Sequence, residues 1–516
     1  MAQYGYFGDL ASVEQGVITD ADINAGQTLT LTNDQEWIMD GYVYVEDGAT
    51  LIIEPGTVIK GRTVATTGDL TSALIIARGG KIIADGTANE PIIFTSELDD
   101  LSTTSDLTAV DNQTWGGIII LGNSIVGEDG GTDVIEGIPS NEPRIQYGGN
   151  DPADNSGILR YVSIRHGGSV LGADNEINGL TLGGVGNGTV IDYIEVFANK
   201  DDGIELFGGT VNITHAVVGF VGDDSYDMDE SWNGYIQFAL GVQGEENGQG
   251  DNAIEYDGSE EANKNPNETG RIYNGTFIGP GTGSANAKGN GLLLKKDGKV
   301  QIWNSIFVDQ AGPVYKYDGA DESAIAGNIA FGFAGQLLDG DQPAVFDVQQ
   351  VDPQLRGISR QPDMGLNPLP SEGSIALTGA AEAPAEAASV DYVGAFQFEN
   401  WAFGWTAMSD YGYFDEMNVG TVEFGSTGNG LILPVPNPNP VNSGFAHLNF
   451  ELPASTEAQL SVFDMTGRQM NQIDLGQLNE GLNQYQLNVM NYSNGTFFLL
   501  LTTEYGAVSQ KFIIHK

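Results

Sequence analysis

The chain has 516 residues, which is enough for two or three domains with substantial hydrophobic cores. It contains no cysteine, and this excludes disulfides, thiolate metal sites and catalytic thiols. The 70 Asp and Glu against 20 Lys and Arg give a net charge of −50, which disfavours nucleic acids and anionic membranes as partners and favours metal cations. No run of about 18 apolar residues occurs, so no membrane span is expected.

Short apolar segments separated by turn residues repeat along the first part of the chain. Leu51-Ile52-Ile53 recurs as Leu74-Ile75-Ile76 after 23 residues, and the segment 201–206 recurs as 223–228 after 22 residues. A period in the low twenties with alternating apolar residues predicts a solenoid. Leucine-rich and helical repeats are disfavoured, because their residue spacings are missing. We therefore expect an all-β protein whose residues 1–415 form a right-handed parallel β-helix of about 12–16 coils.

The repeat also predicts which side chains stack in the core. Ile204 and Leu206 should point inward, while Glu205 between them should point to solvent. A register of 22 residues places Tyr226 over Ile204 and Met228 over Leu206. One coil cannot bury its inner face alone, so the ends need caps. We assign the N-terminal cap to residues 4–17 and expect an irregular excursion at about 351–390.

Two adjacent coils of this repeat carry many carboxylates. The 22-residue register sets Asp223 beside Asp201, Asp224 beside Asp202, and Asp227 beside Glu205. Carboxylates on adjacent coils lie about 5 Å apart, where they repel one another or stay protonated unless a cation intervenes. Ca²⁺ takes 6–8 oxygen ligands. We therefore predict a Ca²⁺ site drawn from Asp201, Asp202, Glu205, Asp223, Asp224, Asp227 and Asp229. The alternative is a solvated acidic stripe, or carboxylates that cap turn amides.

Parallel β-helices often act on acidic glycans, so an enzyme is the second interpretation. A lyase needs a base and a group that neutralises the uronate; the basic residues near the acidic coils are Arg160, Arg165, His166 and Lys200. A hydrolase would use a carboxylate pair from Asp202, Asp223, Asp224 and Asp227. Because the chain is so acidic, we expect Arg165 and Lys200 to pair with neighbouring acids, and we assign no catalytic residue. We expect Trp115, Trp232, Trp303, Trp401 and Trp405 to pack inside the fold, with a glycan-binding surface as the alternative.

The last part of the chain has a different pattern. Residues 416–433 form a predicted linker, and the Pro/Asn run 434–440 excludes a continuous helix or central strand. Apolar residues then alternate over 446–452, 459–464 and 485–489, with a final apolar run at 497–501. Such short runs with Gly, Asn and Ser between them predict a small Ig-like antiparallel β-sandwich over 434–516.

This C-terminal block resembles the sorting domain of cargo proteins of the type IX secretion system of Bacteroidota. The residues that carry the resemblance are Pro438, Asn439, Pro440, Asp464, Gly467, Arg468, Gly495, Lys511 and Lys516. The resemblance implies that the domain is an address, read by the outer-membrane translocon and its shuttle protein, and that the protein reaches the cell surface or the medium. An ordinary Ig-like stalk is the alternative. Since no leader precedes Tyr4, we expect the numbering to start near a mature terminus.

Several phrases between residues 40 and 415 resemble a family of β-helix surface proteins of Bacteroidota. They include 53–61, 89–96, 178–186 and 201–210, and the closing segment 400–406. The resemblance implies a fold and no activity. We therefore expect a surface or secreted protein that acts by binding, adhesion or as a structural element, with a glycan or a surface protein as its ligand. A polysaccharide lyase or glycoside hydrolase is the alternative.

Overall fold

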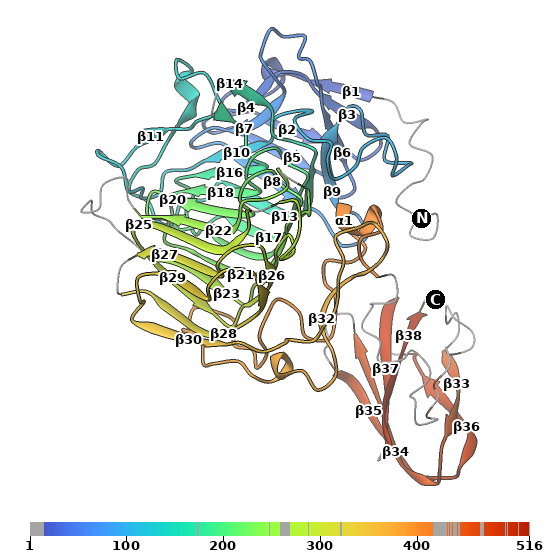
Figure 1. Ribbon diagram of the computed structural model, residues 1–516. Helices are drawn as coiled ribbons and strands as arrows, with labels where there is room; N and C mark the ends of the chain where they lie inside the picture. The colour runs from blue at the N-terminus through green and yellow to red at the C-terminus, as the bar shows by residue number, and fades with distance from the viewer. Residues whose placement is uncertain are drawn as a thin grey trace. The chain divides into compact units, whose positions relative to one another are not determined.

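The structure is a computed structural model (Figure 1). It describes residues 15–172, 175–246, 248–258, 269–286, 288–319 and 322–415, and after these residues 431, 433, 436, 441, 444–464, 469–490, 492, 494–503 and 505–514. The chain divides into two compact units, residues 1–418 and 419–516. In these described ranges, none of the helices has the length and apolarity that a membrane crossing requires.

The first unit is a parallel β-helix, and one of its faces, sheet B, carries the candidate site described below. Successive strands of sheet B pair in parallel, one coil after the next. In order, they are β4 (Tyr42–Val45), β7 (Ala73–Ile76), β10 (Ile118–Leu121), β16 (Leu180–Gly183), β18 (Ile204–Phe207), β20 (Tyr226–Asp229), β22 (Asn252–Asp257), β25 (Asn290–Trp303), β27 (Tyr315–Gly319) and β29 (Leu338–Gly340).

The opposite wall, sheet A, has two parallel rows of strands. One row runs through β1 (Gln15–Ile18), β3 (Glu36–Met39), β6 (Val58–Gly61), β9 (Ile92–Ser96), β24 (Thr276–Ile278) and β26 (Ile306–Gln310). The other runs through β2 (Thr28–Leu31), β5 (Thr50–Ile53), β8 (Lys81–Asp85), β23 (Thr269–Tyr273) and β30 (Val345–Gln349). Longer strands span both rows: β13 (Gly157–Arg165), β17 (Val190–Phe197), β19 (Asn212–Gly219), β21 (Tyr235–Val242) and β28 (Ala324–Phe333).

The core between the two walls is a stack of apolar side chains. Tyr226 pairs with Ile204 and Met228 with Leu206, and all four are fully buried, as the repeat predicts. Glu205 is also buried, with 6% of its surface exposed, so the expectation that it points to open solvent was wrong. Its side chain does leave the core, but other polar side chains of neighbouring coils lie against it.

The coils differ in length far more than a uniform repeat allows. The coil from Ile204 to its partner Tyr226 has the expected length, whereas the coil from Ile118 to its partner Leu180 is more than twice as long. Leu51 and Leu74, which look like repeats of one another, belong to different sheets: Leu51 pairs with Ile82 and Leu74 with Val43. Sheet B accordingly has ten strands in the described part of the chain, fewer than the expected 12–16 coils.

The segment after the last coil returns along the flank of the β-helix. Residues 351–390 are more regular than expected, because β31 (Leu355–Ile358) and β32 (Leu366–Pro370) form an antiparallel pair. A second apolar cluster joins this segment to sheet A. The short helix α1 (Ala407–Asp410) is fixed by Glu195, which accepts hydrogen bonds from the amides of Ala407 (2.6 Å) and Met408 (3.1 Å). Of the predicted N-terminal cap, residues 4–14 lie outside the described residues, and Val17 is already part of β1.

The second unit consists of two antiparallel sheets around one apolar core. The strands β33 (Phe445–Leu452) and β36 (Gly481–Asn488) form one sheet. The other has the order β35 (Gln469–Leu478), β34 (Thr456–Asp464), β37 (Gly495–Thr503) and β38 (Gly506–Ile514). Both units are thus built from strands, as predicted from the alternating apolar residues.

Candidate functional site: a row of carboxylates on the outer face of sheet B

One position of each sheet B strand forms a row of side chains on the outer face, which we call the outer row. Residues at equivalent positions of parallel strands lie directly beside one another at the strand spacing of about 4.8 Å. The register gives the order Tyr44, Ile75, Ile119, Thr181, Glu205, Asp227, Glu255, Leu293, Lys316 and Asp339. Three carboxylates therefore follow one another in the middle of the row.

A second row lies just before these strands or at their first residue, and its members are joined by hydrogen bonds. We call it the turn row: Asn178, Asp202, Asp224, Asn252 and Asn290. Its carboxylates accept hydrogen bonds from the next coil. Oδ1 of Asp202 accepts from the amide of Asp224 (2.8 Å). Oδ1 of Asp224 accepts from the amide of Asn252 (2.5 Å) and from its Nδ2 (2.9 Å). The turn row thus ties the coils together, which agrees with the alternative prediction that carboxylates cap turn amides.

The two rows meet, so that carboxylates of both lie close together. Three overlapping groups each offer ligand oxygens that all lie within 4.8 Å of one another. They are Asp201 with Asp202 and Asp223; Asp202 with Glu205 and Asp227; and Asp224 with Asp227 and Glu255. Several of these residues are also well shielded from water, since Asp202 is 7% exposed and Asp224 only 4%.

Burial and mutual repulsion raise the pKa of these carboxyl groups. For Asp202, burial is the main cause and the charge of Asp227 is the next, and together they hold its pKa well above the ordinary range. The pKa values of Glu205, Asp224 and Asp227 are raised in the same direction, again by burial first. Burial and the neighbouring Asp223 raise the pKa of Asp201 to about 7. At neutral pH these groups therefore retain protons or need a counter-charge.

The nearby lysines balance only part of this charge. Lys295 forms an ion pair with Glu255, and Lys288 forms one with Asp251 (2.5 Å). Asp227 receives little compensation, because its Oδ1 is buried and has no hydrogen-bond partner among the described residues. Carboxylate oxygens without nitrogen or sulfur ligands match the preference of hard cations such as Ca²⁺. The site can therefore hold a divalent cation or a set of shared protons.

The predicted site residues are placed as follows. Asp201, Asp202, Glu205, Asp223, Asp224 and Asp227 lie in the three groups, whereas Asp229 lies at the end of β20 beside Phe207 and belongs to none of them. Sequence reasoning missed Glu255, although Ile254-Glu255-Tyr256-Asp257 repeats the pattern of Tyr226-Asp227-Met228-Asp229. The coil that joins Tyr226 to its partner Ile254 is longer than the one before it, so a search at the shorter period passes over Glu255.

The basic residues considered for a lyase are mostly engaged elsewhere. Arg165 is 1% exposed, and its Nη2 lies 2.9 Å from Oδ2 of Asp410, which agrees with the expected pairing. His166 is buried between the carbonyl of Asp111 and the hydroxyl of Tyr411. Arg160 pairs with Asp85 (2.5 Å). Lys200 lies near the carboxylates and lowers the pKa of Asp201, against the larger effects that raise it.

Three of the tryptophans are buried inside the fold, as expected, whereas Trp37, Trp303 and Trp401 are half-buried. Trp115, Trp232 and Trp405 are fully buried, and their indole N–H groups donate to backbone carbonyls. Trp401 stacks on Phe396 in the flanking segment. These side chains stabilise the β-helix and its flank.

Only part of the predicted sorting signal can be placed in the sandwich. Pro438, Asn439, Pro440, Gly467, Arg468 and Lys516 lie outside the described residues. The described members are strand residues: Asp464 is opposite Phe497, Gly495 is opposite Ile514, and Lys511 is opposite Phe498.

Each of the two units matches a known protein family. Residues 22–344 match the pectate-lyase-like β-helix domain, and residues 437–515 match the secretion system C-terminal sorting domain. The first match spans more than half of the chain, so the protein belongs to the pectate-lyase-like β-helix family. A search of curated proteins finds no match to it. The sorting domain indicates an origin in Bacteroidota and export by the type IX system, so the protein is secreted or displayed on the cell surface.

Proposed function

We propose that this protein is a non-catalytic surface or secreted binding protein whose carboxylate rows hold Ca²⁺ as a structural ion. The observation that carries the proposal is the close approach of the carboxylate oxygens in the groups Asp202, Glu205, Asp227 and Asp224, Asp227, Glu255. Each group offers three ligand oxygens, and Ca²⁺ completes its shell of 6–8 oxygens with bidentate carboxylates, carbonyls and water. Asp227 belongs to both groups and is therefore the central ligand.

The ion would have a clear physical effect on the β-helix. Without it, each buried carboxyl of Asp202, Glu205, Asp224 or Asp227 keeps a proton or suffers repulsion from its neighbours across the coils. When Ca²⁺ is bound, the carboxylates of two or three neighbouring coils are all attracted to the same ion. A ligand that binds the folded state alone stabilises it, by about 2.7 kcal/mol at 100 times the dissociation constant.

The test is thermal unfolding of the full chain with EDTA and with added Ca²⁺. We expect Ca²⁺ to raise the melting temperature by several degrees and Asp227→Asn to remove most of this increase. Asp339→Asn is the matched control, because Asp339 occupies the same row at an exposed position. An identical melting temperature under both conditions would exclude a structural Ca²⁺ ion.

A carbohydrate-active enzyme is the second candidate, and one observation favours it. Lys295 and Glu255 form a cation–carboxylate pair on the outer face of sheet B, next to carboxyl groups whose pKa values are raised. A screen of the purified protein against alginate, pectate and neutral glycans distinguishes the candidates. We expect no turnover; turnover that is lost in Lys295→Ala or Asp224→Asn would make the enzyme the better interpretation.

We propose further that the translocon and its outer-membrane shuttle protein recognise the sandwich of the second unit. The described strands of this unit have their own apolar core, which supports independent recognition. Deletion of residues 434–516 should leave the β-helix inside the cell, as measured by fractionation and immunodetection. Normal surface display of the truncated protein would refute the recognition.

A further inference from the structure

The sandwich of the second unit ends in four edge strands among its described residues, and one of them, β36, differs from the others. The four-stranded sheet ends in β35 and β38, and the two-stranded sheet consists of β33 and β36 (Figure 1). An edge strand presents a row of backbone N–H and C=O groups that a further strand can join. Proteins usually protect such edges with charged side chains, bulges, proline or a covering segment.

Three of these edges carry a protection of this kind. The pairing of β35 with β34 shifts register twice, and the exposed Asp474 adds a charge to β35. The strand β38 carries the exposed Lys511, and its last residue, Ile514, forms a bridge with Val441. The strand β33 carries Glu451, which is exposed. These three edges are therefore poor templates for another strand.

The strand β36 has none of these protections. Its eight residues, 481–488, include no charged residue and no proline. Its pairing with β33 covers the whole strand without a register shift. In the described part of the chain, β33 is its only partner strand. The backbone of β36 is therefore a regular, uncharged template along the side that faces away from β33.

The side chains of β36 suit pairing with another strand. Those exposed on the outer face are Leu482, Gln484, Gln486 and Asn488, and Leu482 is 64% exposed. On the inner face, Tyr485 packs against the apolar core but remains half-buried. An added strand would cover more of Tyr485 and would place its own side chains beside the exposed amides, where cross-strand pairs contribute to stability.

We propose that β36 pairs with β36 of a second copy of this chain, antiparallel and across a two-fold axis. The chain has a net charge of −50, so most contacts between two copies bring like charges together. Pairing through β36 avoids this repulsion between the paired strands, because neither carries a charge. Identical antiparallel strands also fit a closed two-fold dimer, in which both copies use the same surface. The inference concerns the second unit and is independent of the carboxylate rows.

The alternation of side chains limits how the two strands can meet. Exposed side chains must lie beside exposed ones, so the two-fold axis passes through a residue position and not between two positions. The pairings that use most of the strand are centred on Gln484, Tyr485 or Gln486. In the first and last of these, the central glutamine faces its own copy. In the second, Gln484 of each copy faces Gln486 of the other.

Disulfide cross-linking of the full chain tests this pairing directly, because the chain itself has no cysteine. We expect Gln484→Cys, Gln486→Cys or an equal mixture of the two to form disulfide-linked dimers under mild oxidation. Opposite residues of antiparallel strands bring their Cβ atoms close to bridging distance. Asn449→Cys is the matched control, since Asn449 lies opposite Gln484 on the same face of β33. It should form about tenfold fewer dimers, because it lies too far from its own copy.

Sedimentation velocity of the full chain measures the dimer without cross-linking. We expect a reversible dimer with a dissociation constant in the micromolar range, since two paired strands bury less surface than a standard interface. The double variant Gln484→Lys, Gln486→Lys should weaken it about tenfold at an unchanged melting temperature, because each of the three pairings then places like charges in the contact. The double variant His447→Lys, Asn449→Lys carries the same charges on β33 and should dimerise normally.

Three outcomes would overturn this inference. They are a chain that stays monomeric, cross-linking at Asn449→Cys equal to that on β36, and dimers that the two lysines on β36 do not weaken. A monomeric chain would leave this edge to a strand of a different protein. Equal cross-linking at both positions would show that the copies meet without strand pairing at β36.

Discussion

The outer face of sheet B has two halves with the same backbone arrangement and opposite chemistry. On the first coils, Tyr44, Ile75 and Ile119 are covered by apolar residues of the long coil, among them Ile135 and Tyr147. Further along the same row, Thr181 is followed by Glu205, Asp227 and Glu255. In both halves the strand register determines which side chains lie beside one another. The residue types then decide the result: apolar side chains stabilise the fold by packing, whereas adjacent carboxylates need a counter-ion.

The largest effect should come from moving a carboxylate into the apolar half. Ile119→Asp places an unpaired charge in a closed apolar cluster, which costs several kcal/mol. We expect loss of soluble, folded protein, measured by circular dichroism. Thr181→Asp, one strand further along the row, is the matched comparison. It should cost less, and added Ca²⁺ should recover part of the loss.

The two halves should also differ in their response to pH. The pKa of Asp201 is about 7 in the folded protein against 3.8 ordinarily, and those of Asp202 and Asp227 are raised as well. Between pH 4 and 7 the folded state therefore binds more protons than the unfolded state, and its stability falls as pH rises. In EDTA we expect Asp201 to contribute a loss of up to about 1.4 kcal/mol per pH unit in this range, and Asp202 and Asp227 to contribute in the same direction. Urea denaturation at several pH values measures it, and a flat profile would contradict the assigned shifts.

A neutral replacement inside the acidic half should stabilise the protein when Ca²⁺ is absent. Glu205→Gln keeps an oxygen for the side-chain amide of Asn178 and removes one of the repelling charges. At pH 7.5 in EDTA, we expect the free energy of unfolding to rise by about 1–2 kcal/mol. With Ca²⁺ the variant should lose part of its gain. A lower free energy of unfolding of Glu205→Gln in EDTA would show that Glu205 stabilises the protein even without Ca²⁺, contrary to this prediction.

The smallest effect is expected where the outer row becomes exposed. Lys316 lies beyond the carboxylates, next to Leu293, and its side chain is open to solvent. Lys316→Ala should change the free energy of unfolding by less than about 0.5 kcal/mol, since exposed charges contribute little. Denaturant titration checks this value. A decrease of more than about 1 kcal/mol in the free energy of unfolding would mean that Lys316 interacts with the carboxylates further along the outer row.

The central coils could be predicted from the sequence because their length is regular. Ile204, Glu205 and Leu206 alternate and recur one period later as Tyr226, Asp227 and Met228, which predicts the pairing of Glu205 with Asp227. The apolar half could not be predicted, because its coils contain long insertions that break the period. The burial of Glu205 was missed for a related reason: alternation separates inner from outer positions, but it does not report what covers an outer side chain.

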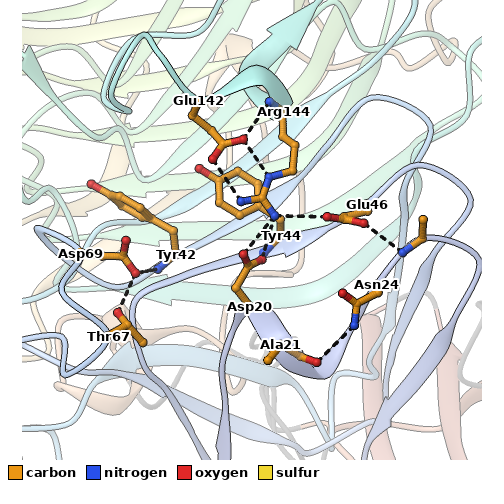
Figure 2. Close-up of polar contacts among 11 residues, drawn as sticks. Asp20, Ala21, Asn24, Tyr42, Tyr44, Glu46, Thr67, Asp69, Glu142 and Arg144 are labelled. Atoms are coloured by element: carbon orange, nitrogen blue, oxygen red, sulfur yellow. Dashed lines mark hydrogen bonds and ion pairs between the residues drawn. The ribbon is translucent and has the colours of Figure 1, made fainter.

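The ion pairs of Arg144 on the first coils (Figure 2) also lie beyond sequence reasoning. Arg144 pairs with Asp20 (3.0 Å) and Glu46 (3.3 Å), which are distant from it in the sequence. Their meeting depends on the path of the long coil between Ile118 and Leu180. By contrast, the sandwich of the second unit was predictable, because strands such as β33 and β36 alternate apolar and polar residues within one short segment.

The measurement that tests the central claim most directly is anomalous diffraction from crystals of the full chain grown with Ca²⁺ and then exchanged with Mn²⁺. The account predicts an anomalous peak bound by Asp227 together with either Asp202 and Glu205 or Asp224 and Glu255, at carboxylate distances typical of these ions. The peak should be absent in Asp227→Asn. Crystals that show these carboxylates hydrogen-bonded to one another, without a peak, would contradict the account and identify the rows as a store of shared protons.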